Sequence, residues 1–234
     1  MGWRQGASRT PAAPARHIAC PNVHAAPTAM EKPDVRPTHP DGPLAKAPDQ
    51  SDLVLVIIDM LSDWQAPGMD VLLKAAHARL PRLVQLKQAC RDAGIPTIYA
   101  NDNLGRWRSD CKSLVASAVE AGGMARDIAE QLGPDAQDYF VLKPKHSAFF
   151  ATPMDLLLEH LGAKHLLLTG VSADQCVLAT ATDALMHDYE VTVLGDCIAA
   201  PTAQRTEAAI AHFEQVMRTR VAVSTDLNLT QPTT

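Results

Sequence analysis

Residues 53–59 read LVLVIID, six apolar residues followed by a carboxylate. An unbroken apolar run of this length is typical of a strand that is covered on both faces, as in a parallel sheet. Comparable runs recur along the chain at PTIYA (96–100), YFVLK (139–143), HLLLTG (165–170), VTVLGD (191–196) and, more weakly, VAVS (221–224). The run at 53–59 is therefore predicted to be the first of six strands.

Segments with helical spacing lie between these runs. Pro81 suits the first turn of a helix that ends before Gly94. Three further helices are predicted at MDLLLEHLG (154–162), DQCVLATATDALMHD (174–188) and TAQRTEAAIAHFEQVMRT (202–219), the last with an apolar stripe of Ala209, Ile210, Phe213 and Met217. Buried strands that alternate with helices predict a three-layer α/β/α fold with a six-stranded, mainly parallel sheet, Rossmann-like in its layout. Ligands of such sheets bind at the carboxyl ends of the strands, near a topological switch point.

Composition separates a tail from a body. The first 50 of the 234 residues contain nine of the 17 prolines and have no periodicity, which predicts a disordered tail. We therefore expect a tail at 1–50, one domain at 51–227 and a short C-terminal tail at 228–234. The net charge is −5, and the body alone is more acidic, so a nucleic-acid partner and an anionic membrane are not expected.

The cysteines and the apolar runs indicate a cytoplasmic protein. No apolar stretch approaches the roughly 18–20 residues that span a bilayer. The cysteines are odd in number and scattered, without a CxxC pair, which suits a reducing compartment and leaves room for one catalytic thiol. They are Cys20, Cys90, Cys111, Cys176 and Cys197.

Two charged residues stand at the ends of predicted strands. Asp59 closes the first strand, where a helix cap or turn is slightly favoured over a chemical role. Lys143 ends the third strand, and an amine within an apolar run is costly to bury unless it is paired. Asp59 is the partner that we expect for Lys143. The Asn-Asp-Asn sequence at 101–103 is typical of a turn.

The segment GVSADQCV (170–177) follows the fourth strand and is the most informative stretch of the chain. Gly170 and Ser172 permit a tight turn, which places Cys176 in the first turn of the next helix. A helix N-terminus and a nearby Lys143 would lower the pKa of the thiol, and the N–H groups there could receive an oxyanion. A buried cysteine that packs as a small hydrophobe is an equally good interpretation of Cys176 and the better one for the other cysteines of the body.

Several of these features together resemble the isochorismatase-like cysteine hydrolases. They are Asp59 after an apolar first strand, Lys143 shortly before Ser-Ala-Phe (147–149), and Gly-Val (170–171) with Cys176 six residues after the glycine. Thr-Ala-Thr-Asp-Ala-Leu (180–185) and a strand that closes with Asp196 are similar as well. The resemblance covers about residues 53–224. It implies a six-stranded parallel sheet and a family rich in amidases such as nicotinamidases.

The resemblance also implies roles for individual residues. Cys176 would be the nucleophile, Asp59 its general base and Lys143 the cation that supports both, which agrees with the chemistry argued above. The backbone N–H groups of Ser172 and Cys176 would form the oxyanion hole, with a cis peptide at 171–172. The reaction would attack a small amide, release ammonia or an amine, and hydrolyse the thioester. A homodimer or homotetramer is implied too.

The chain departs from the nicotinamidase pattern after the second predicted strand. The metal site of those enzymes combines an Asp with several His there, whereas residues 101–110 contain no histidine, so we expect no metal and no cofactor. Alternatives to an amidase are a vinyl-ether hydrolase of the isochorismatase type, a thiol sensor that pairs Cys176 with Cys197, and a non-catalytic member of the fold. The residues expected to line the pocket for a small-molecule substrate are Trp64, Asn101, Trp107, His146 and Phe149.

Overall fold

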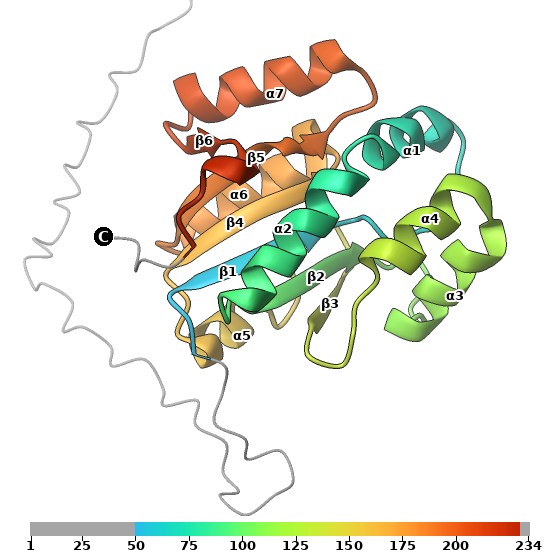
Figure 1. Cartoon of the computed structure of the whole chain (residues 1–234), viewed down its shortest axis with the longest axis horizontal. Helices are drawn as coiled ribbons and strands as arrows, with labels where there is room; N and C mark the ends of the chain where they lie inside the picture. Colours follow the sequence, from blue (N-terminus) through green and yellow to red (C-terminus); the bar gives the residue numbers. More distant parts are fainter. Residues whose placement is uncertain (1–49, 230–234) are drawn as a thin grey trace, which may run out of the picture. The chain divides into compact units, whose positions relative to one another are not determined.

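The computed structural model describes residues 50–229, so the tails predicted at 1–50 and 228–234 lie almost entirely outside the described residues. All six predicted strands are present, and they form one all-parallel sheet in the order β3-β2-β1-β4-β5-β6 (Figure 1). The strands are β1 (Leu53–Ile58), β2 (Thr97–Asp102), β3 (Tyr139–Lys143), β4 (His165–Val171), β5 (Glu190–Ala199) and β6 (Arg220–Ala222).

Helices connect the strands and cover both faces of the sheet. They are α1 (Met69–His77), α2 (Leu80–Asp92), α3 (Cys111–Ala121), α4 (Gly123–Leu132), α5 (Met154–Leu161), α6 (Leu178–Met186) and α7 (Ala203–Gln215). The predicted positions of α2, with Pro81 in its first turn, and of α5 are confirmed. The helix predicted at 174–188 is instead a π-helical turn, Ala173–Val177, that continues into α6. None of these helices is long and apolar enough to cross a membrane.

Two hydrophobic clusters fill the space between the sheet and its helices. One cluster packs one face of the sheet against α5, α6 and α7, and it includes Phe213 of the predicted α7 stripe. The other packs the opposite face against α1, α2 and α4. Because β1 has a fully buried sequence of six apolar residues, it contributes side chains alternately to both clusters, as the strand prediction requires.

The strand order creates a switch point between β1 and β4. From β1 the chain proceeds outward to β2 and β3, and from β4 it proceeds in the other direction to β5 and β6. The carboxyl ends of β1 and β4 approach each other closely at Gly170, which has a φ of +99°. A Cβ atom at this position would lie 2.0 Å from the carbonyl oxygen of Ile58, so only glycine fits there. This is the edge of the sheet where a ligand site is expected.

Candidate active site

Asp59 lies directly at the switch point, one residue after β1. Its backbone has a φ of 52°, and its side-chain Oδ1 accepts a hydrogen bond of 2.6 Å from the backbone N–H of Asp102, at the end of β2. The neighbouring strand thereby fixes the direction of the Asp59 carboxylate. The other oxygen, Oδ2, remains for a cation.

Lys143 supplies this cation from the end of β3, two strands away from β1. Its side chain is fully buried and crosses the end of β2 to place Nζ 2.8 Å from Asp59 Oδ2. Nζ also donates to the carbonyl oxygen of Lys145 at 3.1 Å and lies 3.7 Å from Asp102 Oδ2. The pairing of Lys143 with Asp59 that the sequence predicts is present in the structure.

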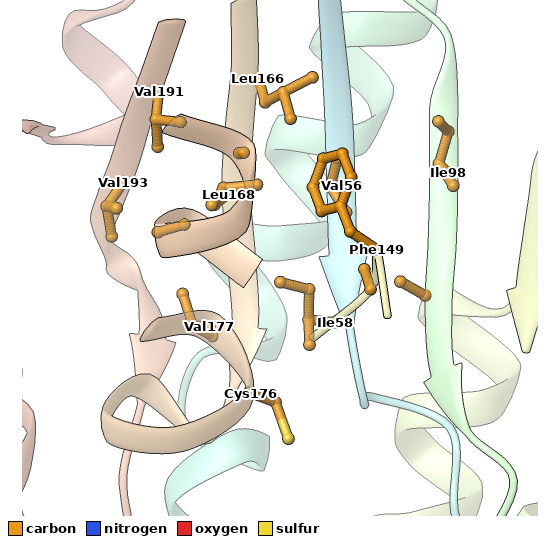
Figure 2. Packing of buried hydrophobic residues seen from close by; sticks show 14 of the residues in the cluster. Val56, Ile58, Ile98, Phe149, Leu166, Leu168, Cys176, Val177, Val191 and Val193 are labelled. Carbon is orange, nitrogen blue, oxygen red and sulfur yellow. The ribbon is translucent and has the colours of Figure 1, made fainter. Parts of the chain in front are cut away.

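Cys176 completes the arrangement from the π-helical turn after β4. Its side chain lies at the carboxyl-end margin of the cluster on the α5, α6 and α7 side, beside the end of β1 (Figure 2). Sγ lies 3.5 Å from Nζ of Lys143, and the negative charge of the nearby Asp59 acts on the pKa of the thiol. The structure therefore brings Asp59, Lys143 and Cys176 together from three different strand ends, with Lys143 in contact with both of the others.

Burial controls the ionisation of these three groups. It raises the pKa of Asp59 above its usual value, against the opposing charge of Lys143. Burial alone would lower the pKa of Lys143, but the charges of Asp59 and Cys176 raise it. Burial and the Asp59 charge raise the pKa of Cys176 to about 12, and Lys143 only partly opposes them. The expectation of a lowered thiol pKa is therefore wrong, because desolvation outweighs the nearby cation.

His146 is the one predicted pocket residue that reaches the thiol. It is exposed, and its Nδ1 lies 3.6 Å from Sγ of Cys176. Phe149, three residues further on, is buried in the same cluster as Cys176 and stacks on the ring of His187.

The other predicted pocket residues take different places. Trp64 is buried in the cluster on the α1 and α2 side. Asn101 is buried too, and its amide group hydrogen bonds to both the N–H and the carbonyl of Leu61, which fixes the chain after β1. Trp107 is 81% exposed and lines a surface cavity of about 510 Å³ between the loop after β2 and α3. None of these three side chains is among the residues that contact Cys176 as described above.

Ser172 precedes the turn that carries Cys176. The Val171–Ser172 peptide bond is cis, as the resemblance implies. The Ser172 hydroxyl donates to Oδ1 of Asp174 at 2.6 Å, and Nε of Arg205, on α7, lies 2.5 Å from Oδ2 of the same carboxylate. Burial raises the pKa of Asp174, but the hydrogen bonds from Ser172 and Arg205 outweigh burial and hold it below its usual value. An oxyanion hole at the N–H groups of Ser172 and Cys176 stays a prediction.

Sequence reasoning did not single out several residues that support the site. The sequence indicates a turn residue at Asp102, whereas in the structure Asp102 contacts both Asp59 and Lys143. The ion pair of Asp174 with Arg205 joins residues 31 positions apart, which no local pattern reveals. For Asp102 a signal did exist, because it ends a strand at the same edge of the sheet as Asp59.

Cys176 and Cys197 lie in different clusters, on opposite faces of the sheet. Both are free thiols. A disulfide between them would require the sheet to rearrange, which weighs against the thiol-sensor interpretation. Within residues 50–229, no group of three or more His, Cys, Asp or Glu side chains is arranged to hold a metal ion.

The fold and the site together define a Rossmann-like α/β protein with a buried cysteine, lysine and aspartate at its switch point. The chain belongs to the isochorismatase family: the family described as "Isochorismatase domain" matches residues 53–225. The fold predicted from the sequence and the resemblance to this family are both confirmed.

Individual relatives agree with this assignment. The chain is 34% identical over 168 residues to an uncharacterized isochorismatase family protein, YaaI, of Bacillus subtilis, covering 72% of this chain and 92% of that protein. It is 28% identical to a probable inactive nicotinamidase of Arabidopsis thaliana (69% and 88% covered) and 27% identical to the ureidoacrylate amidohydrolase RutB of Serratia proteamaculans (70% and 76% covered). A solved isochorismatase-like hydrolase from Alkaliphilus metalliredigens shares the fold, with a TM-score of 0.62, 24% identity and coverage of 77% and 97%.

Proposed function

We propose that this protein is a cysteine hydrolase that cleaves the C–N bond of a small amide through a thioester, without a metal. One observation carries the proposal: the buried Lys143 amine lies 3.5 Å from Sγ of Cys176 and 2.8 Å from Oδ2 of Asp59, which gathers the three groups at the switch point. A nucleophile within reach of its base, with the base held by a third group, is the arrangement that covalent catalysis requires.

The raised pKa of Cys176 determines how the nucleophile is formed. At neutral pH the resting group is the thiol, so Asp59 must accept the thiol proton as sulfur attacks the amide carbonyl. The carbon–sulfur bond forms, and the electron pair of the C=O bond moves to oxygen. The N–H groups of Ser172 and Cys176 are the proposed donors to this oxygen. Lys143 opposes the rise in the pKa of Asp59 that burial causes and orients the carboxylate before the attack, since it binds Asp59 Oδ2 at 2.8 Å.

The relatives support an amide as substrate at the level of the family. One curated relative is named a ureidoacrylate amidohydrolase and another a maleamate amidohydrolase. Both names describe amide hydrolysis. The relative named a probable inactive nicotinamidase shows that membership alone does not establish turnover, so the thiol itself must be tested.

The test is ammonia release from a panel of small primary amides and ureido acids, with the parent protein and three variants. Cys176→Ala and Asp59→Asn should each lower turnover by about 10³-fold or more, because one removes the nucleophile and the other removes its base. Cys197→Ala is the matched control: its thiol is also buried, with a pKa raised to about 12, but it lies on the other face of the sheet. This variant should retain turnover.

Mass spectrometry of the quenched reaction should show an acyl adduct on Cys176. Full activity of Cys176→Ala would contradict the thioester mechanism. Turnover of a vinyl ether that survives Cys176→Ala but not Asp59→Asn would identify an isochorismatase-type hydrolase instead. A parent protein that binds amides but turns none over would identify a non-catalytic member of the family.

A further inference from the structure

His146 is a second nitrogen-bearing side chain within reach of the sulfur of Cys176. Its Nδ1 lies 3.6 Å from Sγ of Cys176, almost the same distance as Nζ of Lys143. The difference is access: the Lys143 side chain is fully buried and that of Asp59 is 15% exposed, whereas His146 is exposed. His146 therefore joins the buried sulfur to solvent.

The backbone on both sides of His146 is fixed, so its position over the thiol is built into the fold. On one side, the carbonyl of Lys145 accepts a hydrogen bond from the Lys143 amine. On the other side, the N–H of Ala148 donates to the Thr180 hydroxyl at 3.0 Å, in a fully buried contact. Thr180 lies four residues after Cys176, so both residues face the same loop. The helix that carries the nucleophile thus also holds the loop that carries His146.

A thioester cycle transfers protons at two points after the thiol proton has moved to Asp59. The departing amine must gain a proton when the C–N bond breaks, and the water that attacks the thioester must lose one. Asp59 alone could serve both points in turn, but its side chain is only 15% exposed, whereas His146 is exposed to the solvent that supplies the water. Asp59 can then hold the thiol proton until sulfur regains it, provided that a second group serves the amine and the water. An imidazole can carry the other proton, because it exchanges protons with water at physiological pH.

We propose that His146 is a catalytic acid and base that carries one proton from the hydrolytic water to the departing amine; this role rests on the proposed thioester function. As the C–N bond of the tetrahedral adduct breaks, nitrogen takes a proton from the His146 imidazolium, and the C=O bond reforms. Neutral His146 then removes a proton from water as the water oxygen attacks the thioester carbon. The C–S bond breaks, sulfur regains the proton held by Asp59, and His146 is again protonated. The net reaction adds one water across the C–N bond.

The test uses p-nitrophenyl acetate, which separates the two halves of the cycle. Its p-nitrophenolate leaves without needing a proton, so acetylation of Cys176 should not require His146. Water attack on the acetyl-thioester should require it. We expect His146→Gln to acetylate within about twofold of the parent rate and to lose the acetyl group about 100-fold more slowly, the usual size of an acid–base contribution. Stopped-flow release of nitrophenolate gives the first rate, and the intact mass over time gives the second.

Two further variants make the result specific. His160→Gln changes another exposed histidine, on α5, and should leave both rates unchanged. His146→Ala opens a solvent-accessible space next to the sulfur, so added imidazole should restore much of its deacetylation rate. A merely structural role of His146 would not respond to imidazole.

The outcomes separate this role from the proposed function. Acetyl-Cys176 that hydrolyses at the parent rate in His146→Gln, or equal slowing of both steps without rescue by imidazole, overturns the role of His146 and leaves the thioester function standing. A parent protein in which no acetyl group reaches Cys176 overturns the thioester function and the role of His146 together.

Discussion

Replacing Lys143 by Met removes a buried cation and leaves its carboxylate partner without compensation. Lys143 Nζ has three polar contacts within 3.5 Å: Asp59 at 2.8 Å, the Lys145 carbonyl at 3.1 Å and Cys176 Sγ at 3.5 Å. Breaking a buried ion pair by removing one partner costs about 3–5 kcal/mol, since the remaining charge keeps its desolvation penalty. We expect Lys143→Met to lower the free energy of unfolding at pH 8 by this amount.

Urea unfolding followed by circular dichroism measures the effect. With a slope of about 2 kcal/mol per M of urea, the midpoint should fall by roughly 2 M. Lys164→Met is the control, because Lys164 Nζ lies 3.0 Å from Asp52 but the two side chains are 73% and 45% exposed. An exposed pair contributes about 0–1 kcal/mol. Adding Asp59→Asn to Lys143→Met should recover part of the loss, because no buried charge then remains. Equal losses in the Lys143 and Lys164 variants would refute the reasoning.

Three further changes test the packing, the ionisation and the turn that carries the nucleophile. Gly170→Ala places Cβ 2.0 Å from a backbone oxygen of β1 and should lower the free energy of unfolding in urea by about 3 kcal/mol or more. The control Gly162→Ala, at a φ of +69° with no atom within 4 Å, should lower it by about 1–2 kcal/mol. Similar losses in the two variants would contradict the close approach of the strands. Burial raises the pKa of Cys90 from 9.0 to about 12, so the unfolded chain releases the thiol proton at a lower pH than the folded protein. The free energy of unfolding therefore falls as the pH rises between these two pKa values, by up to about 1.4 kcal/mol per pH unit. Cys90→Ala should make this slope shallower by that amount in urea titrations above pH 9, and an unchanged slope would count against the assignment. Asp174→Asn weakens the charged contact with Arg205, 2.5 Å away, and should slow acetylation of the nucleophile about 10-fold, as expected for the loss of about 1.4 kcal/mol from a charged hydrogen bond. Arg205→Met should act similarly. A loss of stability with unchanged acetylation would show that the pair is structural only.

The strands were predictable because β1 and its neighbours are buried on both faces, and burial on both faces leaves an unbroken apolar run in the sequence. Helices α1, α3 and α4 have weaker signals. The hydrophobic side chains of α3 that become buried are few, namely Leu114 and Ala118, and the capping contact of Asp110 with Ser113 is short and polar. Such a segment resembles a loop until its tertiary contacts are known. The π-helical turn at Ala173–Val177 is equally invisible, since its residues also suit an α-helix.

Asp59 and Lys143 could be paired from the sequence because both stand at the carboxyl ends of predicted parallel strands and because a lysine in an apolar run needs a partner. The ionisation of Cys176 could not be predicted in the same way. The sequence places a cation near the thiol, but the sign of the pKa shift depends on the balance between that cation and the loss of water around sulfur. In the structure the Lys143 charge is already satisfied by Asp59 at 2.8 Å, so the thiol experiences a nearly neutral pair rather than a free cation.

This balance has a chemical consequence for the whole site. A thiol that is neutral at rest is a poor target for oxidants and alkylating agents, because the thiolate is the reactive form. In the proposed mechanism sulfur becomes nucleophilic when Asp59 takes its proton, and the charge of Lys143 opposes the rise in the pKa of Asp59 that burial causes. In this mechanism the thiol therefore depends on the Asp59 carboxylate, and the carboxylate in turn depends on the Lys143 amine. Loss of Lys143 should thus act on the nucleophile in two ways, by removing the amine 3.5 Å from Sγ and by removing the cation 2.8 Å from its base.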